Sequence, residues 1–319
     1  VTDAAPLIDT TNTTMANNIT SDEFDRLPKA RSFQSLALNS TSTNSGEIEG
    51  GIQVNGASGA ENNFTIDGIS TTSLLNGQSR QDAVFEILQE VQVKTGGISA
   101  EYGGALGGVV SAVTKSGGNS FHGDIHYYLS GNKISAANRK RLLLSPSNDT
   151  TTAYYQDAKQ KNDNNEIGYA LGGYFIKNRL YFYSAASPNF GSRTNDYGFA
   201  NGAESGSIDQ DSTRHMLFNK LSFDITKTLR GSMHWLWTPT KSVGTLPGYG
   251  GECPNCITSS KAANSIRANQ GFFAPQSNYG AQLDWTLSST SLFSVRAGRF
   301  WDNYKDVGLR SEEHTSELQ

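Results

Sequence analysis

The sequence predicts a small α+β domain followed by antiparallel strands of a transmembrane β-barrel, and three observations support this fold class. From about residue 119 onward, apolar and polar residues alternate with period two, which is typical of strands that expose one apolar face. Short turns alternate with long polar connections over the same region. The chain has a mean hydropathy of −0.48. It nevertheless carries 33 Gly, 13 Tyr, 15 Phe and 4 Trp among its 319 residues, a composition that favours strands and loops over disorder.

Residues 1–117 are predicted to form the small domain. Strand-like runs at 51–55 and 63–67 alternate with connections rich in Ser, Thr, Asn and Gly. Residues 83–90 predict a short helix, and residues 91–95 predict the strand that follows it. No long amphipathic helix is expected in this domain.

Residues 118–309 are predicted to form the barrel wall. On the first strand, one face is polar and the other is apolar: His122, Asp124, His126, Tyr128 and Ser130 against Ile125, Tyr127 and Leu129. Runs 217–225, 229–237 and 281–287 repeat this alternation. Strands of about ten residues, apolar on one side and aromatic near their ends, suit a wall that faces lipid.

The connections between these strands differ in length at the two ends of the predicted wall. Short turns are predicted at 177–179, 226–228 and 288–290, and long polar loops at about 131–165, 188–212 and 239–276. Outer-membrane barrels pair short periplasmic turns with long extracellular loops, whereas a soluble sandwich has no reason to keep this asymmetry. About seven strands precede residue 310, which is too few to close a barrel.

Several function classes are disfavoured by the sequence. The net charge of −4 offers no basic face for nucleic acid, and no stretch approaches 18 consecutive apolar residues. The glycine run before Lys115 lacks the spacing of a phosphate-binding loop, and no hydrolase or metalloprotease motif is present. His122, Asp124 and His126 share a strand face, but alternate residues lie about 6.6 Å apart and chelate a metal poorly. We therefore expect no catalytic, cofactor-binding or metal-ligating residues, no cofactor, and a protein that is not an enzyme.

The two cysteines, Cys253 and Cys256, lie in a loop rich in Gly and Pro. No βαβ pattern surrounds them, so a local disulfide is favoured over a redox motif. They supply two ligands at most, which is a weak basis for a metal site.

Segments 62–69, 90–110, 112–117 and 121–123 together resemble the plug and first barrel strand of TonB-dependent receptors, and in particular the Oar-like branch. Ser111 stands where this branch usually has Asn. The residues assigned to the plug motif by this resemblance are Asn63, Asp67, Gly68, Glu101, Tyr102, Gly103, Gly104, Gly107 and Gly108. Asp67 and Gly68 suit a turn at the end of a strand. The other glycines suit close approach to the barrel wall or positive φ angles.

The resemblance implies a plug inside a barrel of about 22 strands in the bacterial outer membrane, of which this chain holds the first part. It also implies energy-coupled uptake of a large or scarce substrate such as a peptide, protein, glycan or chelate. The partners implied are the TonB complex of the inner membrane, outer-membrane lipid and an unknown extracellular ligand, with no nucleic acid. Two alternatives remain open: an adhesion or signalling barrel without net transport, and a secreted β-rich hydrolase.

The last ten residues, Arg310 to Gln319, resemble the translation of a sequencing-library adapter. We expect this segment to be an artefact, and the predicted wall therefore ends at residue 309.

Overall fold

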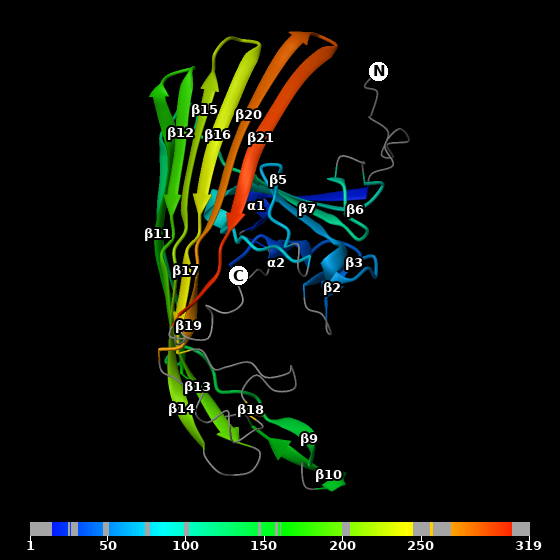
Figure 1. The fold of residues 1–319 in the computed structure, drawn as a ribbon, viewed down its shortest axis with the longest axis vertical. Helices are drawn as coiled ribbons and strands as arrows, with labels where there is room; N and C mark the ends of the chain where they lie inside the picture. Colours follow the sequence, from blue (N-terminus) through cyan, green and yellow to red (C-terminus); the bar gives the residue numbers. More distant parts are fainter. Residues whose placement is uncertain are drawn as a thin grey trace, which may run out of the picture.

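The computed structural model describes residues 15–24, 26, 31–46, 51–73, 77–98, 102–145, 148–156, 159, 161–199, 205–244, 256–257 and 269–307. These residues form a small domain, up to residue 116, and a tall curved sheet that we call the wall. Figure 1 shows the small domain on the concave side of the wall. Among the described residues, no helix has the length and apolar character needed to cross a membrane.

The small domain is built on a five-stranded sheet in the order β1-β6-β7-β4-β5. Strands β4 and β7 run parallel, and the other neighbours in this sheet are antiparallel. Strands β2 and β3 form a separate pair. The elements are β1 (Met15–Thr20), α1 (Ser21–Phe24), α2 (Gln34–Ala37), β2 (Thr43–Ser45), β3 (Ile52–Val54), η1 (Gly59–Glu61), β4 (Asn63–Ile66), β5 (Ile69–Ser70), η2 (Phe85–Ile87), β6 (Leu88–Gly96) and β7 (Val109–Thr114).

The core of the small domain follows from strand alternation. In β6, Val91 and Val93 are fully buried while the residues between and beside them are more exposed. The aromatic and aliphatic side chains of Phe33, Leu36 and Ile66 are buried in the same apolar cluster. Because β-branched residues pack well on a pleated surface, this alternation stabilises the sheet locally as well as through burial.

The predicted helix at 83–90 is wrong. The structure has one 3₁₀ turn at Phe85–Ile87, and β6 already begins at Leu88. Leu88 pairs with Thr114 of β7, so a strand ladder replaces the last part of the expected helix. A single helical turn is costly to nucleate, and tertiary pairing with β7 outweighs the local preference.

Within the described residues the wall contains thirteen strands, and seven of them form its main body. They lie side by side in chain order: β8 (His122–Ser130), β11 (Asn162–Ile176), β12 (Leu180–Ala186), β15 (Leu217–Asp224), β16 (Leu229–Trp237), β20 (Gln276–Ser288) and β21 (Ser291–Asp302). All are antiparallel to their neighbours. They agree with the seven strands predicted from the alternation, and the three short turns fall where they were predicted.

Beyond these seven strands, the wall continues as six others at the end opposite to the short turns. These are β13 (Asn189–Phe199), β14 (Ser205–Arg214), β17 (Thr240–Val243), β18 (Cys256–Ile257), β19 (Gly271–Ala274) and β22 (Lys305–Val307). Pro188, Pro239 and Pro275 lie at the breaks between β12 and β13, between β16 and β17, and between β19 and β20. Proline cannot donate a ladder hydrogen bond, which explains why the strands are interrupted there.

The predicted loops at 131–165, 188–212 and 239–276 therefore need correction, because each contains strands. The first also holds a separate hairpin, β9 (Arg141–Ser145) and β10 (Asn148–Tyr155). These strands are either polar, as in β13 and β14, or short, as in β9 and β19, so they lack a long run of apolar–polar alternation.

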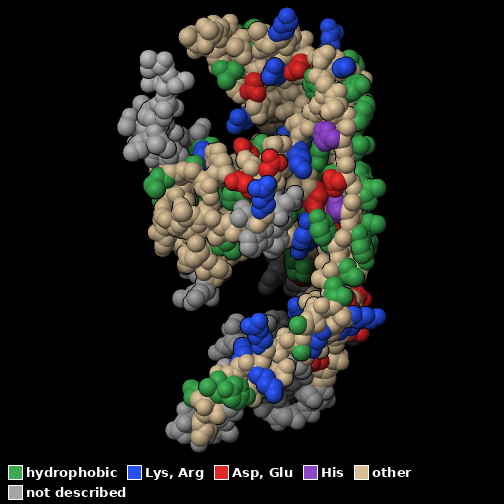
Figure 2. Space-filling view, turned by 180° about the vertical axis from the view of Figure 1, so that it is seen from behind, with side chains coloured by type: hydrophobic (Ala, Val, Ile, Leu, Met, Phe, Trp, Pro, Cys, Tyr) green, Lys and Arg blue, Asp and Glu red, His purple; other side chains and the backbone are tan. Residues whose placement is uncertain are grey.

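The two faces of the wall differ as the alternation predicted. On the convex face, Ile125, Tyr127 and Leu129 of β8 are exposed, as are Leu171 of β11 and Trp285 of β20. Figure 2 shows hydrophobic side chains along this outer edge of the wall. The concave face carries polar residues such as Lys220 and His234 beside buried apolar ones such as Phe218, and it is this face that meets the small domain.

Candidate functional site

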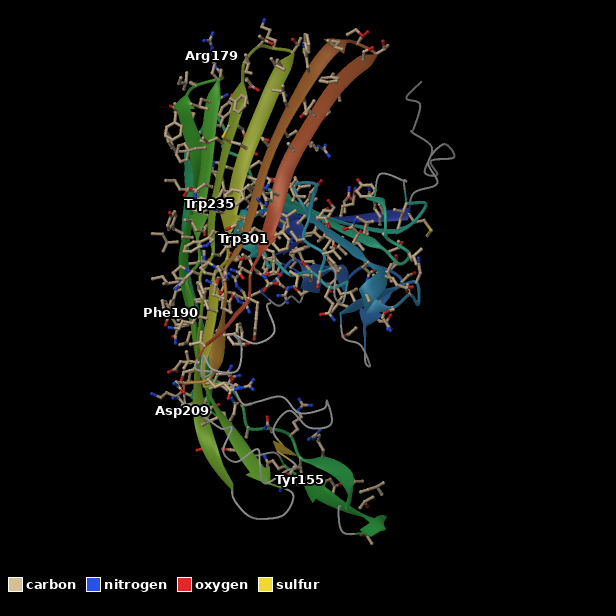
Figure 3. The ribbon with its side chains drawn as sticks, viewed as in Figure 1. Tyr155, Arg179, Phe190, Asp209, Trp235 and Trp301 are labelled. Atoms are coloured by element: carbon tan, nitrogen blue, oxygen red, sulfur yellow. The ribbon has the colours of Figure 1, made fainter. Side chains whose placement is uncertain are left out.

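The contact between the small domain and the wall is the candidate site, because charged side chains from both parts meet there. Four sets of ion pairs cross this contact, two of them buried and two exposed. Figure 3 shows side chains filling the space between the two parts. The exposed pairs are Arg80 with Asp302 and Asp82 with Arg214.

The first of the two remaining sets, the Arg31 cluster, consists of Arg31, Glu86, Tyr128 and Glu166, of which the two carboxylates are buried. The 3₁₀ turn η2 positions Glu86, which binds Arg31 through two hydrogen bonds of 2.9 and 3.0 Å. Arg31 also donates to Glu166 on β11 of the wall. Tyr128 of β8 donates to Glu86 at 3.0 Å, and its ring lies 4.1 Å from the guanidinium carbon of Arg31. One arginine of the small domain thus joins a carboxylate of its own domain to a carboxylate of the wall.

The charges of the Arg31 cluster shift the pKa values of its members. Burial opposes the charged form of Arg31, but hydrogen bonds and charges from Glu166 and Glu86 outweigh it and raise the pKa of Arg31. Burial would also raise the pKa of Glu86. The hydrogen bonds and the positive charge of Arg31 outweigh that effect and hold the pKa of Glu86 below its ordinary value. Both groups are therefore charged at neutral pH.

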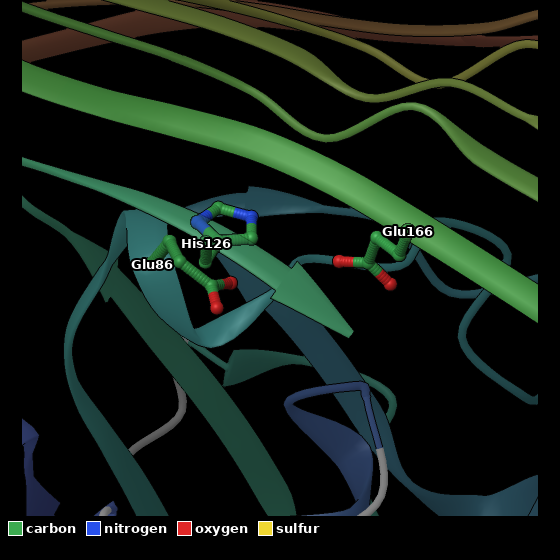
Figure 4. A group of neighbouring side chains, drawn as sticks. All are labelled: Glu86, His126 and Glu166. Carbon is green, nitrogen blue, oxygen red and sulfur yellow. The ribbon is translucent and has the colours of Figure 1, made fainter. Parts of the chain in front are cut away.

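Glu86, His126 and Glu166 also come close enough to suggest a metal site. One ligand atom from each lies within 4.8 Å of the others, and Figure 4 shows His126 and Glu86 facing the carboxylate of Glu166. Both carboxylates, however, bind Arg31, which already supplies the positive charge. His126 contacts Ser187 at 2.8 Å through Nε2 and Asp124 at 3.2 Å through Nδ1. In this arrangement the three residues belong to an ion-pair network rather than to a metal centre.

The second buried set, the Asp67 cluster, consists of Asp67, Thr114, Lys220 and His234. Lys220 of β15 reaches from the wall to Asp67 at 3.1 Å and to the hydroxyl of Thr114 at 2.9 Å. Thr114 donates its backbone N–H and its hydroxyl to the two carboxylate oxygens, at 2.9 and 2.5 Å. Nδ1 of His234 lies 3.5 Å from the same carboxylate. Asp67 and Lys220 are about nine-tenths buried.

Asp67 reaches the wall because of the turn that carries it. Asp67 and Gly68 link β4 to β5 with φ angles of 48° and 81°. A two-residue hairpin with both central residues in the left-handed region favours Asp-Gly, so the turn predicted from the sequence is confirmed. The turn also brings Ile69 against β21, where a Cβ added to Gly298 would lie 2.8 Å from Cγ1 of Ile69.

The concave face accommodates its histidines by placing a glycine opposite each one. His122 pairs with Gly172, His126 with Gly168, and His234 with Gly280 on neighbouring strands. An added Cβ at these glycines would lie 2.2 to 2.5 Å from ring atoms of the histidines. The sequence shows the histidines and the glycines, but only the strand register brings them together.

The remaining residues of the predicted motif lie at three places. Asn63 accepts hydrogen bonds from Ser70 and Thr72 within the small domain. The hydroxyl of Tyr102 accepts a hydrogen bond of 2.7 Å from Lys94. Gly103 lines a cavity of about 570 Å³ between the small domain and the wall.

The last glycines of the motif serve the interior of the small domain rather than the wall. Gly104 has a φ of 84°. A Cβ at Gly107 would lie 2.6 Å from Oδ1 of Asn62, and one at Gly108 would lie 2.8 Å from Cγ1 of Val54. Gly108 also donates its N–H to Asn62. The expected close approach to the wall is therefore wrong for Gly107 and Gly108, whose near neighbours belong to the small domain itself.

Several predicted features lie outside the described residues. These are Glu101 of the motif, Cys253 of the predicted disulfide and the segment Arg310 to Gln319, while only the backbone of Cys256 is described. Sequence reasoning also missed Arg31, Glu86, Glu166 and Lys220 as contact residues. No local signal marks them, because each partner comes from a different element.

Comparison with known proteins found a matching family model and a similar curated protein. Residues 8–109 match the family model of the TonB-dependent receptor plug domain. The TonB-dependent transporter Oar of Myxococcus xanthus is 30% identical over 196 residues, which cover 59% of this chain and 18% of that protein.

Solved structures share the same architecture. The outer membrane transporter YddB from Escherichia coli aligns with a TM-score of 0.62 at 15% identity, over 90% of this chain and 38% of that one. The siderophore receptor PirA from Acinetobacter baumannii aligns with a TM-score of 0.64 at 16% identity, over 91% and 40%. This chain thus spans less than half the length of these relatives.

Proposed function

We propose that this chain is part of a TonB-dependent receptor of the bacterial outer membrane, the class of protein to which it is similar, and that it takes part in energy-coupled uptake of a large or scarce substrate. In this proposal the small domain is the plug, and the wall is the first part of the barrel around it. TonB, energised at the inner membrane, moves the plug and opens a path along the concave face. Extracellular ligand and outer-membrane lipid are the other partners, and no bond of the substrate changes.

The observation that supports this proposal is the polar character of the plug–wall contact. The Arg31 and Asp67 clusters, together with the two exposed ion pairs, join the plug to four wall strands or their ends. Ion pairs of this kind separate into groups that water can solvate, whereas separated apolar surfaces expose a hydrophobic face. Apolar contact is present as well, since Tyr183, Phe218 and Leu236 of the wall belong to the same buried cluster as the plug core.

The cavity beside the Asp67 cluster also supports a movable plug. Its lining joins plug residues Gln92 and Tyr102 to wall residues Lys220, Gln282 and Arg296. A polar, hydrated boundary allows the two surfaces to shift with little loss of packed apolar area.

A disulfide between plug and wall tests whether the plug must move. Ile69 and Gly298 suit this test, because their Cβ atoms would lie no more than about 4.3 Å apart once one C–C bond is added to the 2.8 Å contact. In the full-length receptor, Ile69→Cys combined with Gly298→Cys is expected to abolish receptor-dependent growth on peptide, glycan or ferric-chelate nutrients. A reductant is expected to restore that growth.

The matched control places both cysteines in the wall. Ala281 and Ala297 pair directly across β20 and β21, so Ala281→Cys with Ala297→Cys leaves the plug unlinked and should leave growth unchanged. Growth of the oxidised plug–wall variant at the wild-type rate would refute transport by plug movement. It would instead favour an adhesion or signalling barrel.

A further inference from the structure

The hairpin β9–β10 lies within a cationic segment of an otherwise acidic chain. Residues 131–161 carry six Lys or Arg and two Asp, a net charge of +4, whereas the whole chain has −4. Three of the cations, Arg139, Lys140 and Arg141, are consecutive at the start of β9, and all three are exposed. A local field of this sign attracts anionic ligands.

The same hairpin exposes an apolar face. Leu142 and Leu144 alternate on β9, and Tyr154 pairs directly with Leu142, so the three side chains share one face. Their exposed fractions are 56%, 61% and 77%. Figure 2 shows hydrophobic side chains next to Lys and Arg at this end of the molecule. An apolar face beside a row of cations suits a ligand that carries both apolar groups and negative charge.

The backbone of the hairpin is also open to pairing. Within the described part of the chain, β9 and β10 pair only with each other. Among the described residues, no further strand lies along the outer edge of either β9 or β10. Such an edge accepts an extended peptide as an additional strand, with side-chain contacts on alternate residues.

The position of the hairpin fits a role in cargo capture. Figure 1 shows β9 and β10 at the end opposite to the short turns and displaced to the side of the wall that holds the plug. In Figure 3, Tyr155 and Arg179 accordingly mark opposite ends of the molecule. The exposed apolar residues of the barrel lie on the convex face, so the hairpin is turned toward the mouth of the barrel and away from the lipid side.

We propose that β9–β10 binds an extended acidic polypeptide whose apolar side chains alternate with carboxylates. This inference rests on the proposed uptake function and specifies its cargo as a peptide or protein segment. The cations at 139–141 contact the carboxylates, Leu142, Leu144 and Tyr154 pack against the apolar side chains, and the outer edge of β9 or β10 pairs with the peptide backbone.

The test uses a fluorescein-labelled ten-residue peptide of alternating Glu and Val and the detergent-solubilised full-length receptor. Fluorescence polarisation should show saturable binding that weakens as salt increases. Arg139→Glu, Lys140→Glu and Arg141→Glu together should weaken it at least about tenfold, since three exposed ionic contacts become repulsive. Leu142→Ser with Leu144→Ser should also weaken binding. A peptide N-methylated on alternate amides should bind poorly, because it cannot pair as a strand.

A matched control reverses the same number of charges at the other end of the wall. Lys177→Glu, Arg179→Glu and Lys227→Glu alter exposed residues of the short turns and should leave peptide binding unchanged. Equal weakening by both triple variants would overturn the proposal, because it would reveal only a general charge effect. Tight binding of the N-methylated peptide, or equally tight binding of vesicles of anionic lipid through residues 139–141, would also overturn it.

Failure of the uptake function is distinguishable from failure of this inference. The oxidised Ile69→Cys/Gly298→Cys variant should bind the peptide normally while blocking its entry into cells. Peptide entry that is unaffected by this disulfide contradicts plug-mediated uptake but does not contradict the hairpin site. Growth that depends on the disulfide, with no peptide binding, contradicts the hairpin site alone.

Discussion

The Arg31 and Asp67 clusters both join the plug to the wall through ion pairs with buried carboxylates, but their charges are arranged differently. In the Arg31 cluster, one guanidinium from the plug serves two carboxylates, Glu86 and Glu166. In the Asp67 cluster, one carboxylate from the plug meets one ammonium group, Lys220, and keeps two further hydrogen bonds from Thr114. The first cluster therefore depends on a single residue, whereas the second retains partners when its ion pair is broken.

This difference indicates which residue of the plug–wall contact is most sensitive to substitution. Loss of a buried partner is costly chiefly because it leaves another charge uncompensated. Removing Arg31 leaves two such charges close together, while removing Lys220 leaves one charge that Thr114 still binds. We therefore expect substitution of Arg31 to destabilise the protein more than substitution of Lys220.

Replacement of Arg31 by Met should give the largest effect. It leaves Glu86 and Glu166 buried beside each other without a cation, and we expect a loss of about 3–5 kcal/mol in unfolding free energy. Guanidinium unfolding of the detergent-solubilised protein, with hydrogen exchange of β6 and β7, measures it. Arg80→Met is the matched control, because Arg80 pairs with Asp302 at an exposed site and should cost less than about 1 kcal/mol. Equal losses in both variants would contradict the distinction between buried and exposed contacts.

Replacement of Lys220 by Met should have a smaller effect, about 1–3 kcal/mol, because the N–H and hydroxyl of Thr114 continue to bind Asp67. The same unfolding measurement applies. Lys227→Met removes an exposed lysine from a short turn and should change little. A loss larger than that of Arg31→Met would reverse the ranking of the two clusters.

Acidification should produce the smallest effect, and its direction depends on Arg31. The pKa of Glu86 in the folded protein is held below its ordinary value of 4.5. Its contribution to stability is therefore complete above that value and is lost as pH falls through the folded pKa. Glu86→Gln should remove this part of the acid dependence.

The Arg31→Met variant should show the opposite trend. Burial then raises the pKa of Glu86 above its ordinary value, so the variant should gain stability as pH falls from neutral toward about 5. Unfolding midpoints measured between these pH values test the sign. A variant that weakens on acidification, as the wild type does at lower pH, would contradict the assignment of Arg31 as the cause of the shift.

Regular alternation made the main body of the fold predictable. The seven strands of the main body, the three short turns and the Asp67–Gly68 turn follow from local sequence, because strand alternation and turn chemistry are short-range properties. The helix expected at 83–90 failed because pairing of β6 with β7 outweighs local preference. The strands within the expected long loops were missed because they are either polar or short, and so show no long apolar–polar alternation.

The sequence by itself determined which face of each strand is apolar, where the short turns lie and which segment resembles a plug. Only the tertiary structure decided that Arg31 would meet Glu166 and that Asp67 would meet Lys220, since these partners are separated by 135 and 153 positions along the chain. The physical reason is that strand alternation depends only on neighbouring residues. A charge pair between two bodies depends instead on how the plug docks against the wall and on strand register, to which distant parts of the chain contribute together.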